Sequence, residues 1–196
     1  EAVGWVSGII VPGGFGRRGA EGKITAIKDA RELELPYLGL CYGFHMAVIE
    51  YARNVCGLPD ADTTEISPDT KHPVICLLPE QYEIEGIGGN MRLGGSDICI
   101  KKDSKAYALY HNTRLMSAAG TIRERFRHRY ELNPVYKEQL EENGLVFSGW
   151  APNQPIMQVL EIPAHPFFIG VQYHPEFTSR PMSPNPLFKG FVKACL

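Results

Sequence analysis

Two strand-and-helix pairs at the start of the chain constrain the fold more than any other feature of the sequence. A short apolar run at Ser7–Val11 precedes the stretch Ala20–Leu33, in which apolar residues recur at helical spacing. A second apolar run, Tyr37–Leu40, precedes a second helical pattern at Met46–Val55. Alternation of short apolar strands with helices is typical of βαβ units on a parallel sheet. The sequence therefore predicts an α/β fold.

Strand patterns dominate the rest of the chain. The glycine-containing pattern from Tyr82 to Ile100 predicts short strands. Further apolar runs predict strands and helices; the strands are Val74–Leu78, Leu145–Ser148, Met157–Ile162 and Phe167–Gln172, and the helices are Pro134–Glu142 and Pro186–Cys195. We expect a doubly wound, mostly parallel sheet with helices on both faces and an added antiparallel portion. At 196 residues, the chain is expected to form one domain, residues 1–196.

Composition excludes several classes of protein. Lys plus Arg number 20 and Asp plus Glu number 22, so the net charge of −2 argues against a nucleic-acid-binding domain. No apolar run approaches the about 18 residues of a membrane-spanning helix, and the N-terminus lacks a signal-peptide pattern. The five cysteines are odd in number and lack CxxC spacing. We therefore expect no nucleic acid, no membrane, no metal and no disulfide framework, and a reduced, cytoplasmic compartment.

The pentapeptide Gly39-Leu40-Cys41-Tyr42-Gly43 has the form of a nucleophile elbow. Its glycines permit the sharp strand-to-helix turn that presents the central side chain above a sheet. A cysteine at a helix N-terminus is also expected to gain thiolate character from the helix dipole. The alternative is a small buried residue between two turn glycines, because cysteine is often simply buried.

The tripeptide His174-Pro175-Glu176 follows a predicted strand. Catalytic groups gather at the carboxyl ends of strands in open α/β sheets. Glu176 is placed to orient the His174 imidazole, as the acid of a catalytic triad does. A satisfied surface histidine is the alternative. His165 has a similar context without a following acid, and we interpret it as structural.

Two further segments have both a functional and an ordinary interpretation. The loop Pro12–Gly16 offers backbone N–H groups to an anion or oxyanion, but it lacks the Gly-Lys-Ser/Thr ending of a phosphate-binding P-loop. A plain turn is the alternative. The basic run Arg123–Tyr130 hints at nucleic acid, although alternation of this kind also describes a strand with one solvated face.

Taken together, the glycine loop, the cysteine elbow and the His-x-Glu tripeptide resemble the class I glutamine amidotransferase family. Longer stretches resemble, more specifically, the glutaminase domain of the CTP synthase family. These stretches are PGGFGRRG (Pro12–Gly19), PYLGLCYG (Pro36–Gly43), GGNMRLG (Gly88–Gly94), RERFRHRYELNP (Arg123–Pro134) and QYHPEFTSRP (Gln172–Pro181). They span nearly the whole chain, and the last two are quite specific within the superfamily.

The resemblance implies a role for each residue that matches the family's motifs. Cys41 is implied to be the nucleophile that attacks the glutamine side-chain amide. His174 is the implied base and later acid, and Glu176 orients it. The N–H groups of Gly14 and Tyr42 are the implied oxyanion hole.

The resemblance also implies a binding site for the rest of glutamine. Glu65 matches the acid that pairs with the ammonium, and the backbone at Arg129-Tyr130 matches the part that receives the carboxylate. The basic run thereby becomes part of a substrate pocket rather than a nucleic-acid site. Relatives usually carry CLGMQ where this chain has Cys41 to His45, so His45 replaces a glutamine and is expected to make binding pH-sensitive. The complete implied set is Gly14, Tyr42, Gly43, Phe44, His45, Glu65, Arg129 and Tyr130.

In the family, a separate synthetase domain uses ATP and Mg²⁺ to aminate UTP to CTP, with GTP as an allosteric activator. No P-loop lysine motif occurs in this chain, so the resemblance implies a glutaminase domain without a cofactor of its own. The synthetase domain of the same polypeptide and a homotetramer of the full-length enzyme are the implied partners. Eleven residues precede Pro12, fewer than in the family, so we expect the first strand to be absent and Glu85–Gly89 to be compressed.

Three functions remain as hypotheses. The favoured one is the glutaminase half of a CTP synthase. The second is another class I amidotransferase or a γ-glutamyl hydrolase on the same fold, against which the stretches Arg123–Pro134 and Gln172–Pro181 speak. The third is a non-catalytic regulatory module, against which the intact Cys41, His174 and Glu176 speak.

Overall fold

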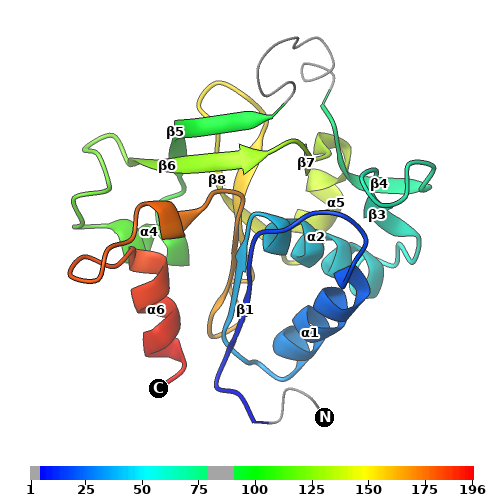
Figure 1. Cartoon of the computed structure of the whole chain (residues 1–196), viewed down its shortest axis with the longest axis horizontal. Helices are drawn as coiled ribbons and strands as arrows, with labels where there is room; N and C mark the ends of the chain where they lie inside the picture. The colour runs from blue at the N-terminus through cyan, green and yellow to red at the C-terminus, as the bar shows by residue number, and fades with distance from the viewer. Residues whose placement is uncertain (1–4, 79–90) are drawn as a thin grey trace.

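A computed structural model of the chain describes residues 5–78 and 91–196. Its centre is a seven-stranded sheet with the order β1-β2-β10-β9-β8-β5-β6 (Figure 1). The strands, in this order, are Ile9–Val11, Tyr37–Leu40, Phe168–Val171, Met157–Glu161, Val146–Trp150, Arg92–Ile100 and Thr121–His128. The predicted short strands before residue 91 and the compressed segment Glu85–Gly89 lie outside the described residues.

The sheet is mixed, and its antiparallel part is larger than the sequence patterns indicate. Strand β2 pairs in parallel with β1 and β10, whereas every other neighbouring pair is antiparallel. The α/β class, the helices on both faces and the antiparallel addition are confirmed, but the sheet is not mostly parallel. The reason is that consecutive parallel strands need a crossover connection, and among the described strands of this sheet only β1 and β2 are joined in that way, through α1.

Helices cover both faces of this sheet (Figure 1). Helices α1 (Ala20–Glu32) and α2 (Tyr42–Asn54) pack on one face, and α4 (Lys105–Tyr110) and α6 (Pro186–Ala194) pack on the other. A smaller sheet lies beside α2 and consists of β3 (Ala61–Thr63), β4 (His72–Cys76) and β7 (Glu131–Leu132). The remaining elements are η1 (Pro134–Tyr136), α5 (Lys137–Glu142) and η2 (Pro175–Phe177).

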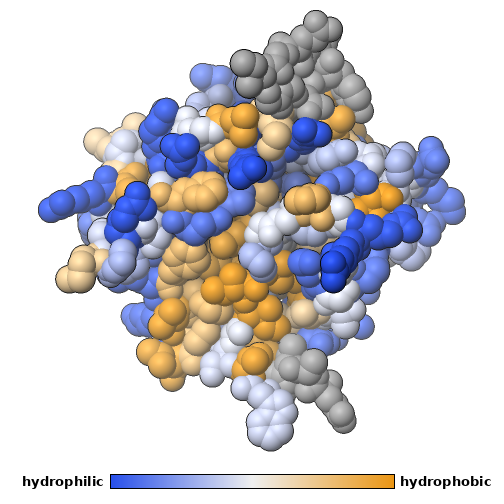
Figure 2. Space-filling model, in the orientation of Figure 1, coloured by the Kyte–Doolittle hydropathy of each residue, from blue (hydrophilic) through white to orange (hydrophobic). Residues whose placement is uncertain are grey.

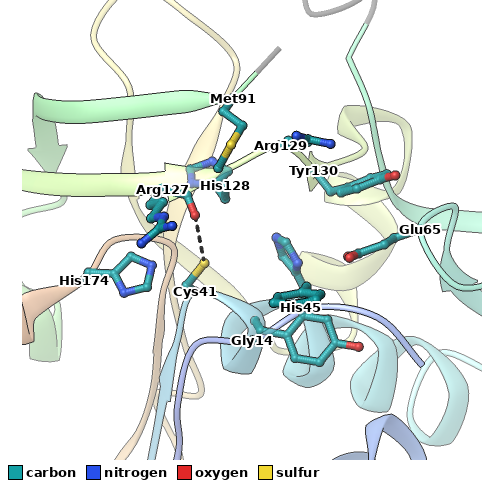
Figure 3. Close-up of a pocket in the computed structure, with 12 residues that line it drawn as sticks. Gly14, Cys41, His45, Glu65, Met91, Arg127, His128, Arg129, Tyr130 and His174 are labelled. Carbon is teal, nitrogen blue, oxygen red and sulfur yellow. Dashed lines mark hydrogen bonds between the residues drawn. The ribbon is translucent and has the colours of Figure 1, made fainter. Parts of the chain in front are cut away.

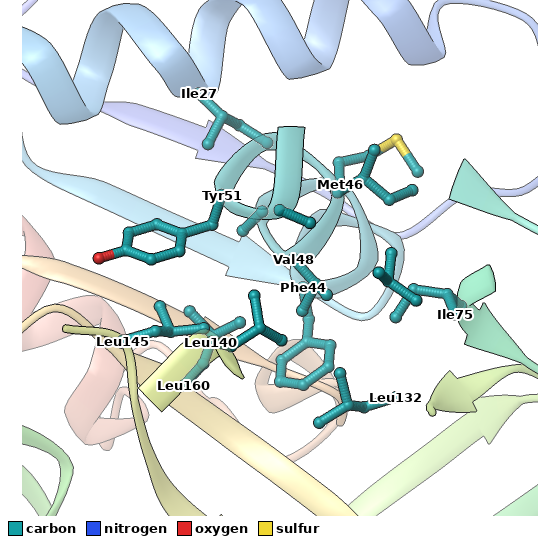
Figure 4. Packing of buried hydrophobic residues seen from close by; sticks show 14 of the residues in the cluster. Ile27, Phe44, Met46, Val48, Tyr51, Ile75, Leu132, Leu140, Leu145 and Leu160 are labelled. Atoms are coloured by element: carbon teal, nitrogen blue, oxygen red, sulfur yellow. The ribbon is translucent and has the colours of Figure 1, made fainter. Parts of the chain in front are cut away.

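Helix α2 is the centre of the larger core. Every residue from Tyr42 to Ala52 is buried, because the helix is enclosed by the large sheet, α1 and the small sheet. Its side chains pack with residues from these elements and from α5; they include Ile27, Ile75, Leu132, Leu140 and Leu160 (Figure 4). Burial on this scale fixes the helix, and therefore fixes the turn that precedes it.

The parallel strands bring the sequence motifs together. Strands β1, β2 and β10 are neighbours and run the same way, so their carboxyl ends lie at one edge of the sheet. Leu40 and Val171, the last residues of β2 and β10, are register partners. The loop at Pro12, the residue Cys41 and the segment leading to His174 therefore start side by side.

On the outer surface, hydrophobic side chains gather over β1 and beside α6, between flanks of polar residues (Figure 2). Ile10 and Val192 are among the exposed large hydrophobic residues of these two elements. Within the described ranges, no helix has the length and apolar character needed to cross a membrane.

Candidate active site

A pocket of about 580 Å³ opens where the three parallel strands end (Figure 3). It is walled by the loop after β1, the start of α2, the segment after β3 and the end of β6. Its lining residues are Gly14, Phe15, Cys41, Tyr42, His45, Glu65, Met91, Arg127, His128, Arg129, Tyr130 and His174.

Cys41 occupies the sharp turn that its neighbouring glycines predict. It joins β2 directly to α2 with φ 50° and ψ −96°, a conformation that a non-glycine residue rarely adopts. A Cβ atom at Gly39 would lie 2.4 Å from the Tyr37 hydroxyl, and one at Gly43 would lie 2.3 Å from the Val11 carbonyl oxygen. Both positions therefore require glycine because of close approach. Such local strain is typical of functional sites.

The Cys41 thiol is buried, and this determines its resting state. Burial raises its pKa to about 12, against the opposing effect of the Tyr42 N–H. Sγ donates to the Arg127 carbonyl oxygen at 3.9 Å and accepts from Gln172 Nε2 at 3.8 Å. The expectation of thiolate character from the helix dipole is therefore wrong for the resting protein, because desolvation outweighs the helix terminus.

His174 is held by its own neighbours and leaves one ring nitrogen toward the pocket. Its Nδ1 lies 2.6 Å from Glu176 Oε1, and its ring stacks on Phe177 with centroids 5.0 Å apart. Nε2 is buried and has no hydrogen-bond partner among the described residues. Burial acts to raise the pKa of Glu176, but the hydrogen bond with His174 holds it below its ordinary value.

A buried carboxylate anchors the segment that carries this pair. Glu124 on β6 accepts hydrogen bonds from the Thr178 hydroxyl and the Asn185 amide, each at 2.7 Å. The Tyr110 hydroxyl also donates to it, at 3.1 Å. Thr178 follows η2 directly, so the turn that contains Glu176 is tied to the sheet.

His165 lies outside the pocket lining, as its structural interpretation predicts. It is buried, with Nε2 3.1 Å from the Ala30 carbonyl oxygen and Nδ1 accepting from the Phe167 N–H at 3.1 Å. The basic run is likewise a strand with one solvated face. Along β6, exposed arginines alternate with buried Glu124, Phe126 and His128.

Comparison with known proteins places this geometry in a family. The family profile described as “Glutamine amidotransferase class-I” matches residues 3–194. The structure of the Trypanosoma brucei CTPS glutaminase domain with bound acivicin is 37% identical and superposes with a TM-score of 0.89, covering 99% of this chain and 72% of that one. The chain is a class I glutamine amidotransferase domain.

Full-length relatives indicate the subgroup. The chain is 51% identical over 196 residues to the CTP synthase of Staphylococcus saprophyticus, and 57% identical over 189 residues to that of Natronomonas pharaonis. These alignments cover 100% and 96% of this chain, but 35% and 33% of the relatives. This amidotransferase domain is therefore of the CTP synthase type and spans about a third of the length of those enzymes.

Most residues that the resemblance implies for glutamine binding surround this pocket. Gly14, Tyr42, His45, Glu65, Arg129 and Tyr130 all line it. Glu65 Oε1 accepts the Gly16 N–H at 3.0 Å, and burial raises the pKa of this carboxyl group. Gly43 and Phe44 do not line the pocket: Gly43 packs against Val11, and the Phe44 side chain points into the core (Figure 4).

His45 is buried in the pocket wall, and this limits its sensitivity to pH. Burial, reinforced by His128, lowers its pKa to about 4. The imidazole is therefore neutral at neutral pH. The pH-sensitive binding expected for this residue shifts to the acid range.

Sequence reasoning missed several residues of the pocket that Cys41 and His174 line. Phe15, Met91, Arg127 and His128 line it, and Gln172 contacts the thiol. All of these residues lie inside the stretches that resemble the family, which is the signal that could have identified them. The alternation along β6 does not reveal that its end lies against Cys41, because that contact joins the edge strand of the sheet to a turn far away in the sequence.

Proposed function

We propose that this domain hydrolyses the side-chain amide of L-glutamine to glutamate and ammonia through Cys41, His174 and Glu176. The observation that carries the proposal is the buried Nε2 of His174, which has no hydrogen-bond partner in the described part of the chain and lies in a pocket that also contains a cysteine elbow. Because Glu176 engages Nδ1, the free nitrogen is the one that can accept a proton from the thiol.

The reaction then follows in balanced steps. The Cys41 thiol gives its proton to His174 Nε2 as Sγ attacks the amide carbon. The amide oxygen becomes an oxyanion that the N–H groups of Gly14 and Tyr42 stabilise. His174 returns the proton to the nitrogen, ammonia leaves and a γ-glutamyl thioester forms. A water molecule, deprotonated by His174, hydrolyses the thioester to glutamate and restores the thiol.

The high pKa of the resting thiol supports this order of events. A thiol with a pKa of about 12 is a weak nucleophile at neutral pH. Proton transfer to His174 must therefore accompany attack, and the negative charge of Glu176 stabilises the imidazolium that forms. Cys41 therefore becomes nucleophilic only when a glutamine molecule is bound with its amide carbon next to Sγ.

Glutamine would lie with its amide at Cys41 and its amino-acid end near Glu65. The Glu65 carboxylate uses Oε1 for the Gly16 N–H, which leaves Oε2 for the ammonium. The backbone at Arg129-Tyr130 would receive the carboxylate. Gly43 and Phe44 would take part only by positioning the start of α2.

In the whole polypeptide, the ammonia would serve a synthetase domain that aminates UTP to CTP with ATP and Mg²⁺. GTP activation and a homotetramer would belong to that larger enzyme of pyrimidine biosynthesis, a ligase. Support comes from the names of the relatives and from the 35% of their length that this chain spans. The five free cysteines fit a reducing compartment, and we place the enzyme in the cytoplasm.

A glutaminase assay with a nucleophile variant tests this proposal. The purified protein should release glutamate and ammonia from glutamine, and Cys41→Ala should abolish release while the circular dichroism spectrum stays unchanged. In the full-length enzyme, CTP formation from supplied ammonia should survive in the variant. Substantial hydrolysis by Cys41→Ala would refute the assignment.

A further inference from the structure

A line of buried polar side chains reaches Cys41 from behind the pocket. His45 Nε2 lies 2.8 Å from Gln172 Oε1, and Gln172 Nε2 donates to Cys41 Sγ at 3.8 Å. His45, Gln172 and Cys41 are 3%, 0% and 5% exposed, respectively. Water therefore does not compete with these contacts, and each hydrogen bond constrains the next.

The orientation of the Gln172 side-chain amide is linked to the ring nitrogen of His45 that carries the hydrogen. The Gln172 carbonyl oxygen can only accept, so its contact with His45 Nε2 is a hydrogen bond in the Nε2–H tautomer of the imidazole. With its oxygen engaged, the Gln172 amide presents its NH₂ group to the thiol. The opposite amide direction would instead place the carbonyl oxygen against Sγ.

The direction of the amide matters because Sγ has two neighbours with opposite effects. The Arg127 carbonyl oxygen accepts from the thiol and therefore favours the protonated sulfur. The Gln172 NH₂ group donates to the sulfur and lowers the pKa of Cys41. When the proton of Cys41 passes to His174 Nε2, only a donor can stabilise the negative sulfur that remains.

We propose that Gln172 stabilises the Cys41 sulfur during attack and that His45 is a positioning residue that fixes the direction of the Gln172 amide. This inference rests on the proposed function for its role in catalysis. Its structural content, a donor turned toward Sγ by His45, is independent of glutamine. A glutamine side chain at position 45 also offers an N–H donor, so it should serve the same purpose, whereas leucine should not.

The reactivity of Cys41 toward iodoacetamide measures the effect directly. The rate of Cys41 alkylation is followed against pH by peptide mapping, which separates it from the other cysteines. Gln172→Leu and His45→Leu should each shift the midpoint of the pH–rate profile to higher pH. At a fixed pH, each should slow alkylation by about three- to tenfold, which is the effect expected from the loss of one hydrogen bond. Gln172→Glu should slow alkylation further, because it replaces the NH₂ donor beside Sγ with a carboxyl oxygen that accepts. His45→Gln, unlike His45→Leu, should keep the wild-type rate of Cys41 alkylation.

The chain offers a matched control for the buried amide. Gln158 is fully buried on the neighbouring strand β9, and its side-chain amide has no partner among the described residues. Gln158→Leu should therefore leave the alkylation profile of Cys41 unchanged. An equal shift in this control would mean that the Gln172 effect is general loosening of the core.

Glutaminase kinetics, compared with the alkylation rates, distinguish a failure of this inference from a failure of the proposed function. Gln172→Leu should lower kcat for glutamine with little change in KM, because Gln172 does not line the pocket. Unchanged alkylation in both leucine variants would overturn the inference even if the enzyme hydrolyses glutamine. Shifted alkylation in a protein without glutaminase activity would overturn the proposed function alone. If Gln172→Leu fails to fold, His45→Leu and Gln172→Glu still decide the matter.

Discussion

The backbone at Gly13 lies so close to the His174 ring that a Cβ atom there would be 2.9 Å from His174 Cε1. The same Cβ would be 3.8 Å from the Cys41 Cβ. The glycine loop therefore leaves no room for a larger residue beside the His174 ring and lies next to Cys41. Since the ring is held by Glu176 and stacked on Phe177, it has little room to move away.

Gly13→Ala should consequently displace the His174 ring and lower kcat by about tenfold or more, since a misplacement near 1 Å can cost that much. Steady-state glutaminase kinetics measure the effect. Gly22→Ala is the control: Gly22 lies in α1 with open space around its Cβ position, so the change should leave kcat unchanged and stabilise the helix. Equal kcat in both variants would contradict the proposed contact.

The pair His174 and Glu176 should act as one unit. Glu176→Gln removes the charge that stabilises the imidazolium and should lower kcat strongly, and His174→Ala should lose at least as much. The double variant should be barely worse than His174→Ala, because residues that act together are strongly non-additive. Multiplicative losses would show that the two residues act separately.

His165→Ala serves as the control for the single and double variants of His174 and Glu176. Its hydrogen bonds to Ala30 and Phe167 are structural, so its loss should cost about 1–3 kcal/mol of unfolding free energy with little change in kcat. Thermal unfolding and turnover, measured on the same sample, separate the two effects. A kcat loss as large as that of His174→Ala would mean that the histidines have been misassigned.

Glu65→Ala should raise KM for glutamine roughly ten- to a hundredfold, as expected when a charge-assisted hydrogen bond is lost. The Gly16 N–H would also lose its partner, which would confuse the interpretation. Glu65→Gln resolves this, because the amide oxygen can still accept from Gly16 but carries no charge. A wild-type KM in Glu65→Gln would show that Glu65 anchors the loop and does not bind the ammonium.

His45 should make stability depend on pH in a defined window. Its pKa is about 4 in the fold, below its ordinary value of 6.5, so the unfolded chain binds the proton more tightly. The free energy of unfolding should therefore fall as pH decreases from about 6.5 to about 4, by on the order of 2–3 kcal/mol. Urea unfolding at several pH values should show a flatter profile for His45→Gln. His111→Gln, at an exposed site, should keep the wild-type profile; identical profiles for both variants would contradict the assignment.

The elements in the first part of the chain were predictable because short apolar runs and helical spacing of apolar residues within single segments indicate them. The expected strand Tyr37–Leu40 is found with the same bounds, and the expected helix Ala20–Leu33 ends one residue earlier. Helix α2 starts at Tyr42, four residues before the predicted Met46, because the elbow turns directly into the helix. Glycines at positions 39 and 43 indicated that turn but not how tightly the helix would follow it.

The balance of parallel and antiparallel pairing was not predictable. An apolar run such as Met157–Ile162 indicates a buried strand but carries no information about its direction. The short helix α4 was also missed, because Lys105–Tyr110 is too brief to show helical periodicity. The elbow around Cys41 and the tripeptide His174-Pro175-Glu176 indicate candidate catalytic residues, and the family resemblance assigns each a role. The contact from Gln172 to Cys41 cannot be inferred from the sequence, because the two residues are far apart in the chain.

Covalent labelling of Cys41 tests the central claim most directly. The protein is treated with an electrophilic glutamine analogue, with and without excess glutamine, and the modified peptide is identified by mass spectrometry. We predict a single adduct on Cys41 that glutamine prevents and that is lost in His174→Ala. Labelling spread over Cys56, Cys76, Cys99 and Cys195, or labelling of Cys41 that glutamine does not affect, would contradict the account.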